Sequence, residues 1–135
     1  MNGIFSSNDG MALGAVAALR EVGKAGKIPV TGSDGSSDVL RLIKAGDMLS
    51  TMYINGYVQG ATATALAIAA VKGDVDMSKL SEKQRDFYLS QTLVTKENAD
   101  DILNQKMNAD EFTYEKMKAD FWKFSVGQIP AGANN

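Results

Sequence analysis

Short apolar runs alternate along this chain with longer stretches in which apolar residues recur every three or four positions. The short runs have the length of buried strands, and the longer ones have the spacing of amphipathic helices. Strands are expected over residues 3–7, 28–33, 48–54 and 92–94. Helices are expected after Asn8-Asp9, after Ser36 or Ser37, over residues 56–72, after Thr95 and after Thr113, with a helical turn near residues 81–87.

Three of these helices have informative faces. In the first, six apolar residues recur at helical spacing and are predicted to form its buried stripe: Met11, Ala12, Ala15, Val16, Leu19 and Val22. The helix over residues 56–72 is rich in alanine and glycine, which permits a close approach of its backbone to a sheet. In the last helix the apolar positions are Tyr114, Met117, Phe121 and Phe124.

The order of elements predicts the fold class. Strand and helix alternate, and a connection of this type is a right-handed crossover between parallel strands. We therefore predict an α/β fold with a parallel sheet flanked by helices. The 135 residues suffice for one domain with a real core and are too few for two.

Composition narrows the function. The chain has no cysteine and no histidine, so it lacks thiolate chemistry, the usual general base near neutral pH and the commonest transition-metal ligand. We expect no cofactor, no metal and no catalytic residue. The net charge of −2, with acidic and basic residues interspersed, argues against a nucleic-acid partner. No apolar run is long enough to span a membrane, and the first residues lack the features of a signal peptide.

Candidate binding residues follow the strands directly. In an open parallel sheet, ligands bind outside the carboxyl ends of the strands. Asn8, Asp34 and the pair Ile54-Asn55 occupy these positions. An amide and a carboxylate suit the hydroxyl groups of a polyol, which need paired donors and acceptors. Helix capping by Asn8-Asp9 and turn formation by Asp34-Gly35 are the alternative interpretations.

Four ordered motifs resemble the type-I periplasmic sugar-binding proteins of ABC importers. They are Asn8-Asp9-Gly10 followed by Met-Ala-Leu-Gly-Ala, the strand that ends in Gly-Ser-Asp34-Gly, the run from Leu42 through Thr51-Met52 to Gly60, and Leu-Val-Thr-Lys-Glu-Asn at residues 93–98. Together they span residues 5–98. The ribose-, xylose- and galactose-type binders are the most similar members, and the resemblance covers only the C-terminal portion of such proteins.

The resemblance implies roles for individual residues. It assigns Asn8 and Asp34 to the hydroxyl groups of a sugar. The family's third polar residue falls on Ile54 here, so that partner is missing, or Asn55 or Tyr53 replaces it. This departure makes a less hydroxylated sugar or a polyol plausible as the ligand.

The resemblance also implies an organisation and a set of partners. Residues 1–54 would end the C-terminal lobe, residues 55–98 would supply the last helix and strand of the N-terminal lobe, and residues 99–135 would add C-terminal helices and a loose tail. The implied partners are a sugar or polyol, a membrane permease, and the missing N-terminal half or a second copy of the chain. The implied location is the periplasm or an extracellular lipoprotein.

Two other functions are compatible with an α/β fold. One is the effector-binding domain of a lactose-repressor-like transcription regulator, which would need a helix-turn-helix that these residues lack. The other is an enzyme that uses Asp9 or Asp34 as a base, for which no paired acid or nucleophile is evident.

Overall fold

The computed structural model describes residues 1–85 and 88–121. These residues form two compact units. The first combines Met1–Ile54 with Gln91–Lys106, and the second combines Asn55–Ser90 with the described residues from Met107 onward. The elements of the first unit are β1 (Ile4–Phe5), α1 (Asp9–Glu21), β2 (Val30–Asp34), α2 (Ser37–Ala45), β3 (Ser50–Ile54), β4 (Gln91–Val94) and α5 (Ala99–Leu103).

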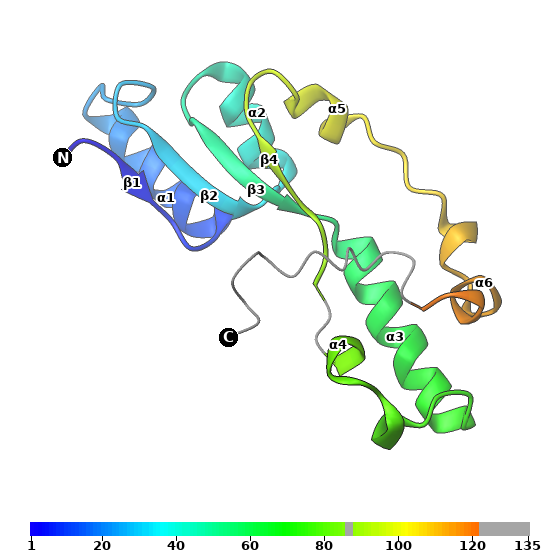
Figure 1. Ribbon diagram of the computed structural model, residues 1–135. Coiled ribbons are helices and arrows are strands. Elements are labelled where there is room, and N and C mark those ends of the chain that lie inside the picture. The colour runs from blue at the N-terminus through cyan, green and yellow to red at the C-terminus, as the bar shows by residue number, and fades with distance from the viewer. Residues whose placement is uncertain (86–87, 122–135) are drawn as a thin grey trace. The chain divides into compact units, whose positions relative to one another are not determined.

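The first unit is built on a four-stranded sheet with the order β1-β2-β3-β4 (Figure 1). The pairs β1–β2 and β2–β3 are parallel, as the sequence predicts. The pair β3–β4 is antiparallel, with Thr51 opposite Val94 and Ile54 opposite Gln91. The prediction of a parallel fourth strand is therefore wrong. β4 thus joins the sheet of the first unit, whereas the helix over residues 56–72 belongs to the second. The assignment of these segments to the lobes of a longer protein stays a prediction.

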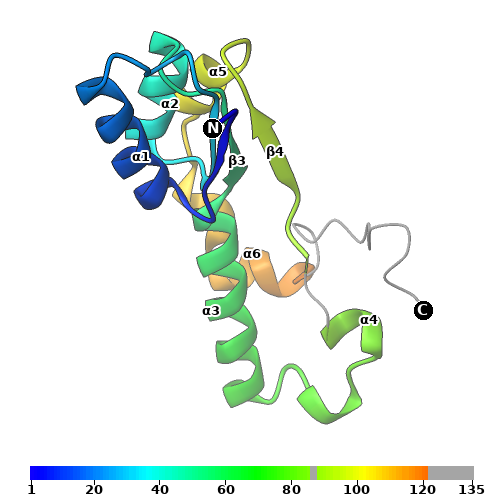
Figure 2. The ribbon, with the colours of Figure 1, turned by 90° about the vertical axis from the view of Figure 1, so that its left-hand side faces the viewer.

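Helices α1, α2 and α5 all cover the same face of this sheet (Figure 2). Consecutive parallel strands joined by right-handed crossovers place both connecting helices on one side. The core between helices and sheet consists of buried aliphatic side chains and one methionine: Ala12, Val16, Leu19, Val30, Val39, Leu40, Ile43, Met48, Val94 and Ala99. The parallel pairing thus places the carboxyl ends of β1, β2 and β3 along one edge of the sheet.

The sequence signals for helix ends are largely confirmed. Asn8 caps α1, Ser36 caps α2, and Gly46 ends α2 in the left-handed conformation. The predicted stripe of α1 is only partly buried, because Met11 is 59% exposed and Val22 is 64% exposed. Helical spacing identifies which residues share a face but cannot show how much of that face the sheet covers.

Several boundaries differ from the sequence prediction. β2 begins at Val30 and β3 at Ser50, two residues later than expected. Thr95 does not cap α5; Asn98 precedes that helix, and its side chain accepts a hydrogen bond from the Thr95 N–H. These residues form a tight turn that uses the hydrogen-bonding groups a helix cap would need.

The second unit contains α3 (Gly56–Lys72), the 3-10 turn η1 (Met77–Lys79), α4 (Glu82–Arg85), the 3-10 turn η2 (Ala109–Phe112) and α6 (Tyr114–Ala119). α3 has the predicted bounds and packs against α6 through a small core of Ala65, Ala69, Met117 and Phe121. Phe124, the fourth residue of the predicted α6 stripe, lies outside the described residues. Within the described part of the chain, no helix is long and apolar enough to cross a bilayer.

A polar cluster holds α6 at the end of α3. Tyr114 Oη donates to Asp74 Oδ2 at 2.6 Å, Lys118 Nζ donates to Asp74 Oδ1 at 2.9 Å, and Lys72 Nζ lies 4.5 Å from the centre of the Tyr114 ring. The hydrogen bonds from Tyr114 and Lys118 hold the pKa of Asp74 below its ordinary value of 3.8. The bond to Asp74 raises the pKa of Tyr114 to about 12.

This cluster predicts the pH dependence of the second unit. The lowered pKa of Asp74 gives stability that is present above pH 3.8 and is lost as Asp74 protonates. The raised pKa of Tyr114 gives stability that is present below pH 10.0 and is lost as pH rises through about 12. We expect Tyr114→Phe to lower the melting temperature by a constant amount between pH 3.8 and 10.0, and by less outside that window.

Thermal melts followed by circular dichroism measure this difference. Tyr57→Phe is the matched control, because Tyr57 lies on α3 and is 69% exposed. The control should melt like the wild type at every pH. A difference between Tyr114→Phe and wild type that does not shrink in acid would contradict the role of Asp74.

Candidate ligand-binding site

The carboxyl ends of β1 and β2 bring two of the predicted residues together. Asn8 follows β1 after a short turn and caps α1, and Asp34 is the last residue of β2. The backbone N–H of Asp9, at the start of α1, donates to Asp34 Oδ2 at 3.3 Å. Because the positive end of a helix dipole favours a carboxylate, this contact is stabilising. The amide of Asn8 and the acid of Asp34 therefore lie on one edge of the sheet.

Asn8 has a structural role as well as a free donor. Its Oδ1 accepts from the Met11 N–H at 2.8 Å, which satisfies one of the unpaired donors at the start of α1. The capping interpretation is thus confirmed. No described residue accepts a hydrogen bond from Nδ2, and Asn8 is exposed. This side chain can therefore offer its Nδ2 donor, and the second lone pair of Oδ1, to a ligand. Its role in ligand binding stays a prediction.

Asp34 has an unusual backbone conformation. Its φ of 128° is the only positive value at a non-glycine position in the described residues, and Gly35 follows with φ 79°. Such conformations cost about 1–3 kcal/mol and persist where the surroundings impose them. No described residue donates to Asp34 Oδ1, and the side chain is exposed, so one carboxylate oxygen remains able to accept from a hydroxyl group.

A neighbouring carboxylate was not singled out as a site residue by the sequence. Asp9 is 2% exposed, its Oδ2 accepts from the Ser36 N–H at 2.6 Å, and its Oδ1 accepts from Thr51 Oγ1 at 2.7 Å. The sequence identifies Asp9 as part of a helix start and, in one alternative interpretation, as the base of an enzyme. Its partners are 27 and 42 residues away, so no local signal could have found them.

Ile54 and Asn55 follow Tyr53, the residue of β3 that pairs with Asp34. Ile54 ends β3, is half-buried and lies opposite Gln91 of β4. Asn55 begins the second unit, where its Oδ1 accepts from the N–H groups of Tyr57 and Val58 and its Nδ2 donates to Met107 Sδ at 3.6 Å. Both ends of the Asn55 amide are thus engaged within that unit. The ligand-binding roles of these two residues stay predictions.

An exposed methionine adjoins the polar pair. Met11 lies in the first turn of α1, and its sulfur accepts a hydrogen bond from Ser7 Oγ at 3.2 Å. The edge therefore presents an N–H donor at Asn8, an oxygen acceptor at Asp34 and the apolar surface of Met11. This combination is suited to a small neutral molecule that has both hydroxyl groups and C–H surface.

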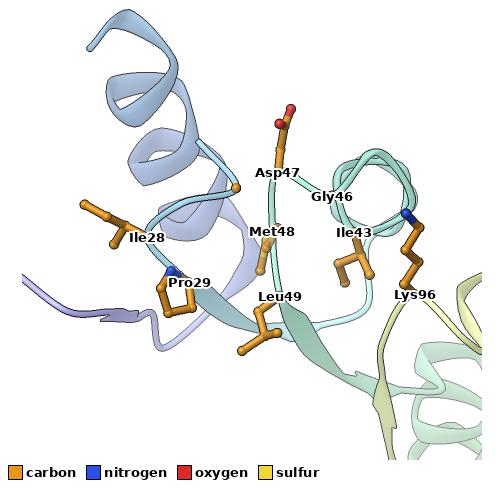
Figure 3. A pocket seen from close by; sticks show the side chains of 9 residues that line it. Ile28, Pro29, Ile43, Gly46, Asp47, Met48, Leu49 and Lys96 are labelled. Carbon is orange, nitrogen blue, oxygen red and sulfur yellow. The ribbon is translucent and has the colours of Figure 1, made fainter. Parts of the chain in front are cut away.

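A cavity of about 240 Å³ lies at the opposite edge of the sheet (Figure 3). Ile28 and Pro29 line it just before β2, Met48 and Leu49 just before β3, and Lys96 just after β4. These positions are the amino-terminal ends of the parallel strands. None of the predicted binding residues lines this cavity, and an open parallel sheet binds its ligands at the other edge.

Comparisons with known proteins agree with the fold. Residues 1–74 match the family model described as a periplasmic binding protein domain. The xylitol-binding protein of Mycolicibacterium smegmatis is 36% identical over 100 residues, which are 74% of this chain and 26% of that protein. The chain thus spans about a quarter of the length of this relative.

Two solved structures have the same fold. A twin-arginine translocation pathway signal protein from Burkholderia phytofirmans matches with a TM-score of 0.78 and 31% identity, over 94% of this chain and 38% of that one. An ABC transporter periplasmic solute-binding protein from Actinobacillus succinogenes 130z, with bound D-allose, matches with a TM-score of 0.64 and 33% identity, over 75% of this chain and 34% of that one. Because the family model covers more than half of the 135 residues, the chain belongs to the periplasmic binding protein domain family.

Proposed function

We propose that this chain is part of a solute-binding protein that presents a sugar or polyol to an ABC importer. The observation that carries the proposal is the edge formed by Asn8 and Asp34, where an amide donor and a carboxylate acceptor are held close by the Asp9–Asp34 hydrogen bond. Xylitol and D-allose, the ligands named for two similar proteins, are small, neutral and polyhydroxylated. They match the pairing that this edge offers.

The mechanism proposed for the intact protein is closure of a cleft. A ligand that contacts two lobes at once favours the closed state by its differential affinity, and the closed form is recognised by the permease. The proposed location is the periplasm or the outer side of the membrane as a lipoprotein. The proposed partners, besides ligand and permease, are the remaining lobe or a second copy of this chain.

Binding is favoured over catalysis and over transcription control. The relative and the allose complex described above are both named as binding proteins. The carboxylates that could serve as a base are engaged in backbone contacts at the helix and strand ends, namely Asp34 with the Asp9 N–H and Asp9 with the Ser36 N–H. These contacts favour a binding role over the role of a base.

Titration of the ¹⁵N-labelled chain with xylitol, D-allose and myo-inositol, followed by NMR, tests the proposal. We expect weak, millimolar binding, because one edge buries only part of a ligand whose full site would enclose most of its surface. The shifted amides should be those of Asn8, Asp34, Gly35 and Ser36. Ethylene glycol at the same hydroxyl concentration is the control and should leave these amides unchanged. Shifts confined to the opposite edge, near Pro29 and Leu49, or no shifts at all, would refute the site.

A further inference from the structure

Asp9 is a buried carboxylate for which the proposed function has no direct use. Both of its oxygens bond to segments outside its own helix, Oδ2 to the Ser36 N–H and Oδ1 to the Thr51 hydroxyl. Its backbone N–H bonds to Asp34. One residue therefore joins the start of α1 to the end of β2, the start of α2 and the strand β3.

Helix capping does not explain this placement. Asn8 already caps α1 through the Met11 N–H. An acidic residue in the first turn benefits from the helix dipole while fully exposed, so that benefit does not require burial. Burying a carboxylate has a substantial desolvation cost, which charge-assisted hydrogen bonds offset only where their geometry is good. The 2% exposure of Asp9 and its two short bonds fit a residue that fixes the relative positions of its partners.

The Asp9 carboxylate also lies close against the backbone of β2 at Gly32. A Cβ placed on Gly32 would lie 2.4 Å from Asp9 Oδ1 and 2.9 Å from Met48 Cε. Only glycine at this position of β2 leaves room for the carboxylate. The strand is therefore adapted to the presence of Asp9, and the side chain cannot turn toward β2 without a clash.

The consequence for the site lies in residues 34–36. β2 is held against β3 as far as Asp34, which pairs with Tyr53. The chain then passes through the two positive φ values of Asp34 and Gly35, and Asp9 fixes the next residue, Ser36. The strained conformation of Asp34 is thus fixed on one side by the sheet and on the other by Asp9. Release of Ser36 would allow Asp34 to relax to an ordinary β or helical conformation and to reorient its carboxylate.

We propose that Asp9 is a positioning residue of the ligand site: its carboxylate holds the Asp34–Ser36 turn in the conformation that presents the free Asp34 oxygen at the strand edge. This inference rests on the proposed function. Asp9 itself does not contact the ligand, and it acts through Ser36 and Asp34.

Three variants test this role by amide exchange and by the xylitol titration. Asp9→Asn removes the negative charge, and Thr51→Val removes the hydroxyl donor, whereas Thr51→Ser retains that donor and is the matched control. We expect Asp9→Asn to speed exchange of the Ser36 amide at least tenfold and to abolish the xylitol-induced shifts of Asp34 and Gly35, while amides of Val16 and Val30 stay protected. Thr51→Val should have the same effects in weaker form, and Thr51→Ser should resemble the wild type.

The outcomes separate this inference from the proposed function. Unchanged Ser36 exchange in both Asp9→Asn and Thr51→Val overturns the positioning role, whatever the sugar titration shows. A uniform rise in exchange across the first unit also overturns it, since that pattern indicates general destabilisation. If Asp9→Asn does not fold, the pair Thr51→Val and Thr51→Ser decides by itself. If the wild type shows no xylitol shifts, the proposed function fails while local release of Ser36 still tests how Asp9 holds the turn.

Discussion

Replacing Gly32 by alanine should destabilise the first unit by about 3 kcal/mol, which is a large share of the stability of a small domain. The added methyl group would lie 2.4 Å from Asp9 Oδ1 and 2.9 Å from Met48 Cε, both well inside contact distance. The Met48 Cε is the end of a flexible side chain and can move. Asp9 cannot move without breaking its bonds to Ser36 and Thr51, which would leave a buried carboxylate short of partners.

Urea unfolding followed by circular dichroism measures this effect. Gly14→Ala is the matched control, because Gly14 lies within α1 and a Cβ there meets nothing within 4 Å. It should stabilise the protein by up to about 1 kcal/mol through better helix propensity. If Gly32→Ala unfolds at the same urea concentration as wild type, the Asp9 side chain can move away from the added methyl group at little cost. That result would contradict a carboxylate held firmly by Ser36 and Thr51.

The parts of this fold that sequence predicts are those set by neighbouring residues. Asn8 and Ser36 are good caps, and Gly46 is a good terminator, so the ends of α1 and α2 follow from chemistry within a few positions. The candidate pair was found in the same way, because Asn8 and Asp34 each follow a short apolar run. The sequence does not predict the positive φ of Asp34, because an Asp-Gly pair is compatible with several turn types.

Features that depend on distant residues were missed. The crossover rule applies to a helix that packs back on the sheet between two strands. α3 belongs instead to the second unit, so the rule does not govern β4, which returns antiparallel to β3. The burial of Asp9 depends on Ser36 and Thr51 in the same way. Nothing near Asp9 in the sequence distinguishes it from a solvated residue in a first helical turn.

Asp34→Gly should weaken polyol binding by about tenfold or more while leaving the stability of the first unit within about 1 kcal/mol of wild type. Glycine adopts a φ of 128° without strain. The substitution therefore recovers part of the roughly 1–3 kcal/mol that this conformation costs other residues. The loss of the hydrogen bond to the Asp9 N–H offsets that gain. Asp34→Ala loses the same bond and keeps the strain, so it should be less stable than Asp34→Gly by about 1 kcal/mol or more.

Both substitutions remove the carboxylate oxygen proposed to accept a ligand hydroxyl, so both should weaken xylitol binding by about tenfold or more, the effect of losing one charge-assisted hydrogen bond. Asp38→Ala is the control: it removes the same charge from an exposed position on α2, where Asp38 pairs with Arg41, and it should leave the titration unchanged. If Asp34→Gly keeps its stability but loses affinity for xylitol, the strained conformation of Asp34 serves ligand binding. If Asp34→Gly binds xylitol like the wild type, the backbone strain of Asp34 has no role in ligand binding.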